Sequence, residues 1–402
     1  MTLPKQVTNY FNKKVAEFLL SDDPLFEMLK WLLNEFMRAE SEALVGSEKN
    51  KHCKERKTYF SGYRSRRFDT RVGTCYLLVP KLRKGGYVPF FVEEKKRSER
   101  ALIDLIQEAY INGVSTRKVE RLARSLGIVG MSASQVSEIT KGLSTEVDQW
   151  RNRPLESVYP VMWVDALYEK IRQNGRIISS AVLVVQGLNQ AGKRDILAIE
   201  PMIDESEASW RATMDKLKDR GVQEVWLVIS DAHKGIQAAV QKSFLGSQWQ
   251  RCKVHFMRNI LAHIPHREKK RFAEQLKQIW SQPDLESAGR FASFLIEKYQ
   301  DRYPEALECL SEGLEDSLQF YHFPLFDKRK ISSTNSLERL NKEVRRRTRV
   351  VGVFPSREAY IRLVTCYLLE YTEDWITEKA YFAQESILEM GTVFKEQKEL
   401  VT

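Results

Sequence analysis

Three carboxylates stand where phosphate chemistry assisted by a metal ion would need them, at Asp165, Asp231 and Glu338. Asp165 lies within the apolar run 158–170, where a buried charge is unfavourable unless it is paired or bound to a metal ion. Asp231 directly follows a second apolar run at 224–230, next to a predicted turn. Two carboxylates held close together repel each other, and a divalent cation relieves that repulsion. Each aspartate alone also has a structural explanation, because an aspartate at a strand end usually caps it or forms a turn.

Glu338 belongs to a basic helix with two distinct faces. Asn335 is the expected N-cap and Glu338 follows three residues later, as in a capping box, so capping is one role for its carboxylate. The other role is catalytic, because a carboxylate beside a row of arginines offers a nuclease a metal ligand next to cations that bind phosphate. The residues expected to bind phosphates are Arg339, Arg345, Arg346, Arg347 and Arg349. An uncovered charged helix is the alternative, and Asn335 and Asn341 either contact DNA or cap the helix.

Cys252 and His255 form a C-x-x-H pair after the second acid. With His263 and His266 downstream, the pair suggests a zinc site. The spacing is not a common zinc pattern, however, and Pro265 interrupts the helix between the two later histidines. We therefore favour a structural role for Cys252 and His255, or a role in positioning DNA near the active site.

The segments around the first two acids have the patterns of a mixed sheet. Three strands separated by hairpin-like breaks are followed by a helix, a fourth strand that ends at Asp231, a second helix and a short fifth strand. The expected ranges are 158–170, 175–188 and 195–202 for the first three strands, 206–221 and 236–244 for the helices, and 224–230 and 248–256 for the last two strands. The order β-β-β-α-β-α-β is that of an RNase H-like core. In that topology the first and fourth strands are neighbours, so Asp165 and Asp231 can converge.

A long helical stretch separates Glu338 from these strands. Residues 256–330 contain four helical patterns, which we interpret as an all-helical insertion into one α/β (α+β) core. The first part of that core covers 155–255, and C-terminal helices at 331–402 complete it.

The first 98 residues divide by charge into two segments. Residues 1–50 contain 6 Lys/Arg and 8 Asp/Glu and show two helical patterns, with an aspartate at a possible N-cap before Pro24. They form either a dimerisation element or a local helical subdomain.

Residues 51–100 hold 15 Lys/Arg against 5 Asp/Glu, and the segment 51–98 should contain strands and turns. Its basic side chains, interleaved with aromatic ones, suit DNA phosphates and groove edges, although a solvated basic face is the alternative. Its candidate DNA contacts are Arg64, Arg66, Arg67 and Arg71.

Residues 99–150 have the size and rhythm of a helix-turn-helix that binds DNA. Ser132 or Ser134 is the expected cap of the second helix. Ser134 and Gln135 would then lie near the exposed N-terminal face of that helix, where base edges are read. Residues 144–156 are expected to be a linker into the next domain.

Composition and charge narrow the class of protein. The 402 residues are 43% apolar and 29% charged, which indicates a globular protein, and the net charge of +10 favours a polyanionic partner. The sequence predicts no membrane span and no secretory signal. The five cysteines show no paired spacing, so we expect a reducing compartment and a cytoplasmic protein, associated with the nucleoid when it is bound to DNA.

Several segments resemble the Mutator-like transposases of bacterial insertion sequences. The most specific are WVDALYEK, VISDAHKGI, RCKVHFMRN and STNSLERLNKEVRRRTRVVGVFPS, and the basic segment GYRSRRFDTRVGTCYLLVPKLRKGG matches as well. The resemblance covers about residues 60–390. It implies an RNase H-like fold with a helical insertion and a catalytic DDE triad at Asp165, Asp231 and Glu338. The family's C-x-x-H pair corresponds to Cys252 and His255, as possible auxiliary residues.

The same resemblance implies cofactors and partners. The three acids would be the metal ligands of two Mg²⁺ (or Mn²⁺) ions. The substrate would be double-stranded DNA, namely the terminal inverted repeats of the element and the target DNA. The implied pathway is copy-out, paste-in transposition through a circular intermediate. Because transposition handles two ends together, we expect a homodimer on DNA.

Two other functions fit part of these observations. A cellular RNase H-like nuclease or resolvase would share the acids, but such enzymes rarely need a basic segment and a helix-turn-helix for end recognition. A domesticated transposase or a repressor would bind DNA without cutting it. Loss of one acid would favour that alternative, yet all three are present.

Overall fold

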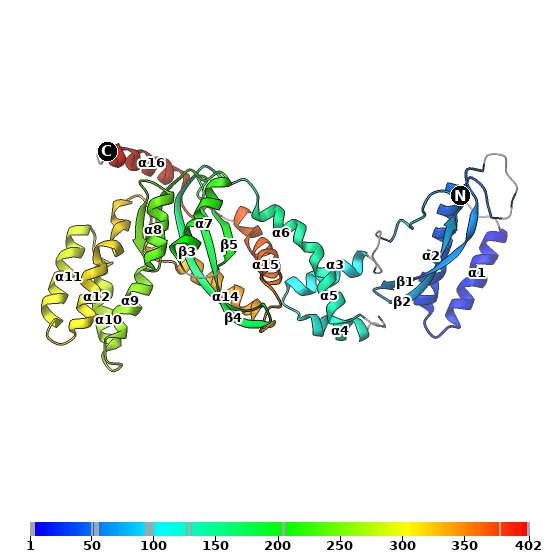
Figure 1. Ribbon diagram of the computed structural model, residues 1–402, viewed down its shortest axis with the longest axis horizontal. Helices are drawn as coiled ribbons and strands as arrows, with labels where there is room; N and C mark the ends of the chain where they lie inside the picture. Colours follow the sequence, from blue (N-terminus) through cyan, green and yellow to red (C-terminus); the bar gives the residue numbers. More distant parts are fainter. Residues whose placement is uncertain are drawn as a thin grey trace. The chain divides into compact units, whose positions relative to one another are not determined.

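The computed structural model describes residues 5–49, 51, 56–92, 98, 100–125, 128, 131–202, 206–377 and 379–399. By its internal contacts the chain divides into two compact units, Met1–Gly142 and Leu143–Thr402, called here the N-terminal and C-terminal units (Figure 1). Each unit has its own hydrophobic core and is described by itself.

The N-terminal unit begins with a helix packed on a β-hairpin. Helices α1 and α2 cover Lys5–Leu19 and Pro24–Val45, and strands β1 and β2 cover Phe60–Thr70 and Gly73–Leu82. The two strands pair antiparallel, and α2 packs against β2. The core between helix and hairpin includes Leu33, Met37, Phe68, Leu77 and Val79. The segments 1–50 and 51–98 therefore share one core, because each covers the apolar face of the other.

Three short helices complete the N-terminal unit. They are α3 (Arg100–Ile111), α4 (Thr116–Ser125) and α5 (Ala133–Thr140). Their apolar sides meet in a small core of Leu102, Ile106, Val119, Ala123 and Val136. The helices α4 and α5 occupy the positions expected for the helix-turn-helix.

Side chains cap two helices of this unit as the sequence predicts. The Asp23 carboxylate accepts a hydrogen bond from the Phe26 amide, with Pro24 at the first helical position of α2. Ser132 caps α5 in a full capping box, because the Gln135 side chain accepts a hydrogen bond from the Ser132 amide in return. Such caps satisfy amides that the helix itself leaves without partners.

A five-stranded sheet forms the centre of the C-terminal unit. In chain order its elements are β3 (Val158–Gln173), β4 (Arg176–Leu188), β5 (Arg194–Pro201), α7 (Glu207–Asp219), β6 (Glu224–Ser230), α8 (Lys234–Ser243) and β7 (Gln248–Arg251). The strand order is β5-β4-β3-β6-β7. β4 is antiparallel to β3 and β5, whereas β3, β6 and β7 run parallel. The expected order of elements is confirmed, including the antiparallel trio and the β3–β6 neighbours.

Helices cover both faces of this sheet. Trp210 and Met214 of α7 and Val240 of α8 pack with Met162 and Val164 of β3 on one face. Side chains alternate along a strand, so the next residues of β3 point to the opposite face. There α14 (Asn335–Thr348) and α15 (Arg357–Thr377) contact β3 and β5. The alternation places Asp165 on the face covered by α14.

Two sequence predictions in this unit are corrected by the structure. The linker expected at 144–156 begins as helix α6 (Ser144–Arg151), which is anchored by the buried Val147 and by a hydrogen bond from Arg362 to Ser144. The fifth strand, expected at 248–256, ends at Arg251, and helix α9 (Lys253–Ala262) starts two residues later.

The insertion between β7 and α14 is helical, as expected. It contains α9, α10 (Lys269–Ile279), α11 (Leu285–Tyr299), α12 (Pro304–Ser317) and the short α13 (Lys328–Ile331), and α9 to α12 lie together in Figure 1. Two 3-10 turns, η1 (Lys141–Leu143) and η2 (Gln319–His322), and the last helix α16 (Gln384–Glu399) complete the secondary structure. Among the described helices, none has an apolar stretch long enough to cross a lipid bilayer.

Candidate active site

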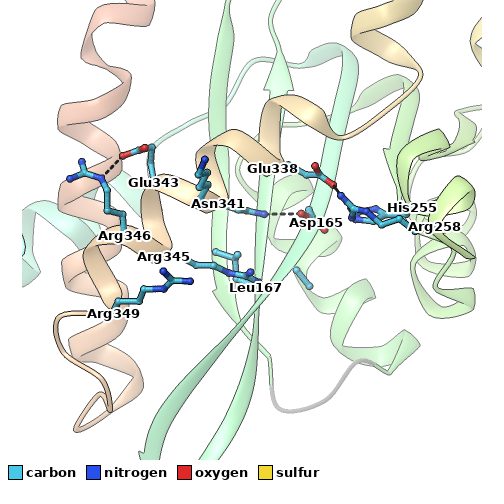
Figure 2. Close-up of a pocket in the computed structure, with 12 residues that line it drawn as sticks. Asp165, Leu167, His255, Arg258, Glu338, Asn341, Glu343, Arg345, Arg346 and Arg349 are labelled. Atoms are coloured by element: carbon cyan, nitrogen blue, oxygen red, sulfur yellow. Dashed lines mark hydrogen bonds and ion pairs between the residues drawn. The ribbon is translucent and has the colours of Figure 1, made fainter. Parts of the chain in front are cut away.

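Asp165 and Glu338 line one pocket of about 590 Å³ on the face of the sheet covered by α14 (Figure 2). Strand β3 contributes Asp165, and α14 contributes Glu338 and Asn341. Helix α9 contributes His255 and Arg258. The pocket thus joins elements that lie far apart in the sequence.

Asp165 is held by a direct contact with α14. Its Oδ2 accepts a hydrogen bond of 2.7 Å from Asn341 Nδ2. Burial raises the pKa of the Asp165 carboxyl, and the nearby Glu338 carboxylate acts in the same direction, although His255 opposes both. A buried carboxylate of this kind is stabilised by a cation.

Asp231 lies at the C-terminal end of β6, level with Asp165. The parallel register pairs Trp163 of β3 with Ile229 of β6, and each aspartate is two residues further along its strand. The Asp231 carboxylate accepts a hydrogen bond from the amide of Ala232, which follows it. Asp231 is not among the residues that line the pocket, but its charge, like that of Asp165, raises the pKa of His255. His255 is therefore close to both aspartates.

Glu338 faces the insertion, as Figure 2 shows. Its Oε1 lies 3.3 Å from His255 Nε2 and 3.1 Å from Arg258 Nη2, without the geometry of a hydrogen bond to either. The prediction of Asn335 as N-cap is wrong, because Thr334 holds that position and no side chain caps the helix. The capping role considered for Glu338 is thus replaced by ionic contacts with α9.

Cys252 connects the end of β7 to the start of α14. Its Sγ accepts a hydrogen bond of 3.3 Å from the Thr334 amide and lies 3.3 Å from Thr334 Oγ1. Beside it, the Lys253 amide donates to the Ser332 carbonyl. These contacts tie the first turn of α14, which carries Glu338, to the sheet.

The Cys252 and His255 side chains also interact electrostatically. The contact with the Cys252 thiol raises the pKa of His255 to about 9, helped by the negative charges of Asp231 and Asp165. Burial disfavours ionisation of the thiol, but the contact with His255 outweighs it and lowers the pKa of Cys252. A protonated His255 supplies a positive charge beside Glu338.

The described part of the chain contains no ready-made metal site. Within it, no three His, Cys, Asp or Glu side chains are close enough together to hold a metal ion as they stand. His263, considered with Cys252 as a zinc ligand, instead contacts Glu305 at 3.0 Å.

Only some of the arginines expected to bind phosphates line the pocket. Arg345, Arg346 and Arg349 line the pocket beyond Asn341. Arg339 is exposed but is not among the lining residues, and Arg347 stacks on the Tyr367 ring. Arg258 is a further cation at the pocket that the sequence reasoning missed. Arg258 follows His255 by three residues, which places the two side chains on the same side of a helix. The expected strand at 248–256 hid this relation, because the helix α9 already begins at Lys253.

Several candidate DNA contacts of the N-terminal unit already have partners within the protein. Arg64 donates to the Tyr87 carbonyl, and Arg67 forms an ion pair with Asp69. Arg71 is exposed. Burial lowers the pKa of Arg66, with help from the neighbouring charge of Arg64. On α5, Ser134 is exposed, whereas Gln135 is partly exposed and is used in the capping box. Their contacts with DNA stay predictions.

Comparisons with known proteins agree over nearly the whole chain. Residues 1–378 match the family described as "Transposase, Mutator family". The chain is 37% identical, over 93% of its length and 94% of the relative's, to the transposase for insertion sequence element ISRM5 of Rhizobium meliloti. It is 36% identical, over 90% of its length and 94% of the relative's, to the transposase for IS256 in transposon Tn4001 of Staphylococcus aureus. It is 39% identical, over 91% and 88%, to the transposase for IS1081 of Mycobacterium tuberculosis.

Proposed function

The chain belongs to the Mutator family of transposases, and from that premise we propose that Asp165, Asp231 and Glu338 form one DDE site that cuts and joins DNA. The observation that carries the proposal is the pocket itself. Asp165 and Glu338 come from β3 and α14, yet they line one cavity together with arginines suited to phosphate. The sheet order β5-β4-β3-β6-β7, with its parallel β3–β6 pair, supports an RNase H-like core.

The chemistry of the pocket fits divalent cations. Carboxylate oxygens are the ligands that Mg²⁺ and Mn²⁺ prefer. Burial raises the pKa of Asp165, and Glu338 Oε1 is a buried oxygen with ionic neighbours but no hydrogen bond in good geometry. Both groups would gain from a cation. Two bound Mg²⁺ or Mn²⁺ ions would activate a water or a 3′-hydroxyl and stabilise the leaving 3′-oxygen.

The proposal gives a task to Asp231 and to eight of the residues that line the pocket. Asp165, Asp231 and Glu338 supply oxygen ligands, and Asn341 keeps the Asp165 carboxylate oriented through its hydrogen bond. Arg345, Arg346 and Arg349 bind the DNA phosphates beyond the acids. His255 and Arg258 neutralise Glu338 while no cation is bound. Displacement at phosphorus then needs no nucleophile from the protein.

The N-terminal unit would recognise the ends of the element. Its hairpin and helix-turn-helix would bind the terminal inverted repeats, while the pocket acts on the ends and on the target DNA. Self-association on DNA is supported by an apolar stripe on α2 that faces solvent. The exposed side chains of that stripe are Leu25, Met28, Leu32 and Phe36. We place the protein in the cytoplasm, on the nucleoid when it is bound to DNA.

A non-catalytic DNA-binding protein is the alternative function. It would use the N-terminal unit in the same way and leave the pocket without a reaction. The proximity of Asp165, His255, Glu338 and four arginines argues against it, because DNA binding alone does not require partly buried carboxylates near phosphate.

The decisive experiment compares wild type with Glu338→Gln on a duplex that carries the end of the element, with Mg²⁺ or with EDTA. The amide keeps the shape of the side chain but removes the charge that a cation needs. We expect cleavage or joining by wild type in Mg²⁺ only, and none by the variant, at equal DNA binding. The matched control is Glu308→Gln, an exposed glutamate on α12, which should cut normally. If wild type binds the end but never cuts it, the non-catalytic alternative is correct.

A further inference from the structure

A second cavity of about 340 Å³ adjoins the active-site pocket. It lies between the C-terminal half of α14 and the helix α15, and it shares Glu343 and Arg346 with the pocket. Figure 2 shows these two side chains joined by their ion pair, apart from Glu338. We call this cavity the aromatic groove. Its main lining residues are Tyr367, Tyr371 and Trp375 of α15, with Glu343, Arg346 and Arg347 of α14.

The rings of α15 form a continuous row. Tyr367, Tyr371 and Trp375 recur every four residues, so they lie on one side of the helix. The ring centroids are 5.8 Å apart between the two tyrosines and 6.2 Å apart between Tyr371 and Trp375. Tyr367 is only 4% exposed, as in a core, whereas Tyr371 is 39% exposed. The ring of Tyr371, in the middle of the row, is therefore open to the groove, and core packing does not explain why an aromatic residue stands there.

Cations hold the outer rings of the row in place. The Arg347 guanidinium lies 4.8 Å from the Tyr367 ring, and the Arg194 guanidinium lies 4.1 Å from the Trp375 ring. On the α14 side of the groove, Arg346 Nε donates a hydrogen bond of 2.8 Å to Glu343 Oε2. Glu370 adds a second carboxylate to the lining. The groove thus offers a flat aromatic surface, phosphate-binding cations and carboxylate acceptors at one place.

We propose that the aromatic groove binds an unpaired DNA base next to the phosphate that the active-site pocket processes. A nucleobase has a flat face that stacks on tyrosine and N–H groups that can donate to carboxylates, and the backbone of its nucleotide carries a phosphate that arginine can bind. This inference rests on the proposed function, because Glu343 and Arg346 line both cavities and a DNA strand held in the pocket would therefore reach the groove. A base can enter the groove only after it leaves the double helix.

The test separates bases from phosphates. The full-length protein, in metal-free buffer with EDTA, is titrated into a labelled duplex that ends in a short single-stranded thymidine extension. A second probe has the same extension with abasic nucleotides, which keep the phosphates and lack the bases. Fluorescence anisotropy gives the two dissociation constants. We expect wild type to prefer the probe with bases by about 5- to 150-fold, the range typical of one stacked base.

Variants assign this preference to the groove. Tyr371→Ala should lose it without weaker binding to the abasic probe, whereas Tyr371→Phe should keep it, because the phenyl ring still stacks. The matched control is Phe294→Ala on α11, another exposed aromatic ring at 52% exposure, which should keep the preference. Circular dichroism confirms that each variant is folded. Equal binding of both probes by wild type, or a preference that survives in Tyr371→Ala, would overturn the inference.

The outcome is independent of catalysis. Binding is measured without metal and therefore does not depend on cleavage. A protein that prefers the probe with bases but never cuts DNA would contradict the proposed function and support base binding in the aromatic groove. A protein that cuts DNA in Mg²⁺ but binds both probes equally would support the proposed function and contradict base binding in the groove.

Discussion

Asn341 Nδ2 donates a hydrogen bond of 2.7 Å to Asp165 Oδ2 and thereby joins α14 to the strand β3. The two residues are 176 positions apart in the chain. Asn341 lies one turn after Glu338 on the same helix, so this single contact sets the position of one acid relative to another.

Replacement of Asn341 by Leu should impair cleavage more than folding. The Asp165 carboxylate would lose its donor and its fixed orientation. With Asp165 as the metal ligand proposed above, this loss should lower activity by about 10- to 100-fold. Cleavage rates in Mg²⁺ and thermal unfolding are the measurements. Gln278→Leu, at an exposed site on α10, is the control and should cut normally. Unchanged cleavage by Asn341→Leu would show that the hydrogen bond has no functional role.

Cys252→Ala should destabilise the fold and displace α14. It removes the acceptor of the Thr334 amide, and an unpaired buried donor costs about 1–3 kcal/mol. We expect the urea midpoint and the cleavage rate both to fall, with Cys252→Ser closer to wild type because a hydroxyl can still accept. The partly exposed Cys309 provides the comparison, since Cys309→Ala should change little. If all three variants unfold alike, the thiol does not anchor the helix.

Gly187 and Gly289 should respond in opposite directions to replacement by alanine. A Cβ at Gly187 would lie 2.6 Å from Tyr159 Cδ1 and 2.7 Å from Leu197 Cδ1, so Gly187→Ala overpacks the core and should destabilise by about 1–3 kcal/mol. A Cβ at Gly289 meets nothing within 4 Å, so Gly289→Ala should stabilise α11 by about 0.5–1 kcal/mol. Urea unfolding of both variants tests this, and equal shifts would contradict the packing described for β4.

Cys75 and Cys366 should resist thiol reagents in the folded protein. Burial raises the pKa of each thiol to about 11, from an ordinary value of 9.0. At pH 8 a shift of two units lowers the thiolate fraction about 100-fold, so labelling should be at least that much slower than in urea. Peptide mapping by mass spectrometry measures both sites.

The same raised pKa values link stability to pH. Below pH 9 both thiols are protonated in the folded and in the unfolded protein, so ionisation does not reduce the free energy of unfolding. As the pH rises from about 9 to about 11 the unfolded chain ionises first, so stability should fall across this window. A free energy of unfolding that rises over this range would contradict the burial of these thiols.

Local patterns in the sequence were sufficient for most elements. Alternating and apolar runs predicted β3 to β6 and the helices between them, because the side-chain period of an element is a local property. The Asp23–Pro24 helix start was predicted correctly for the same reason. The errors lie where a distant partner decides the backbone. Arg362 contacts the residues taken for a linker, and contacts of Cys252 and Lys253 with 332–334 accompany the turn from β7 into α9.

The sequence by itself determined the family and the order of the elements, and it selected the three candidate acids, since each depends on residue type and spacing. Only the tertiary structure decided what surrounds the acids. Asn341 at Asp165, Arg258 at Glu338 and the open ring of Tyr371 come from helices that meet only after the chain has packed. The physical reason is that side chains more than a hundred residues apart are brought together by burial of the helix and sheet faces between them, and no local period records which partners that burial selects.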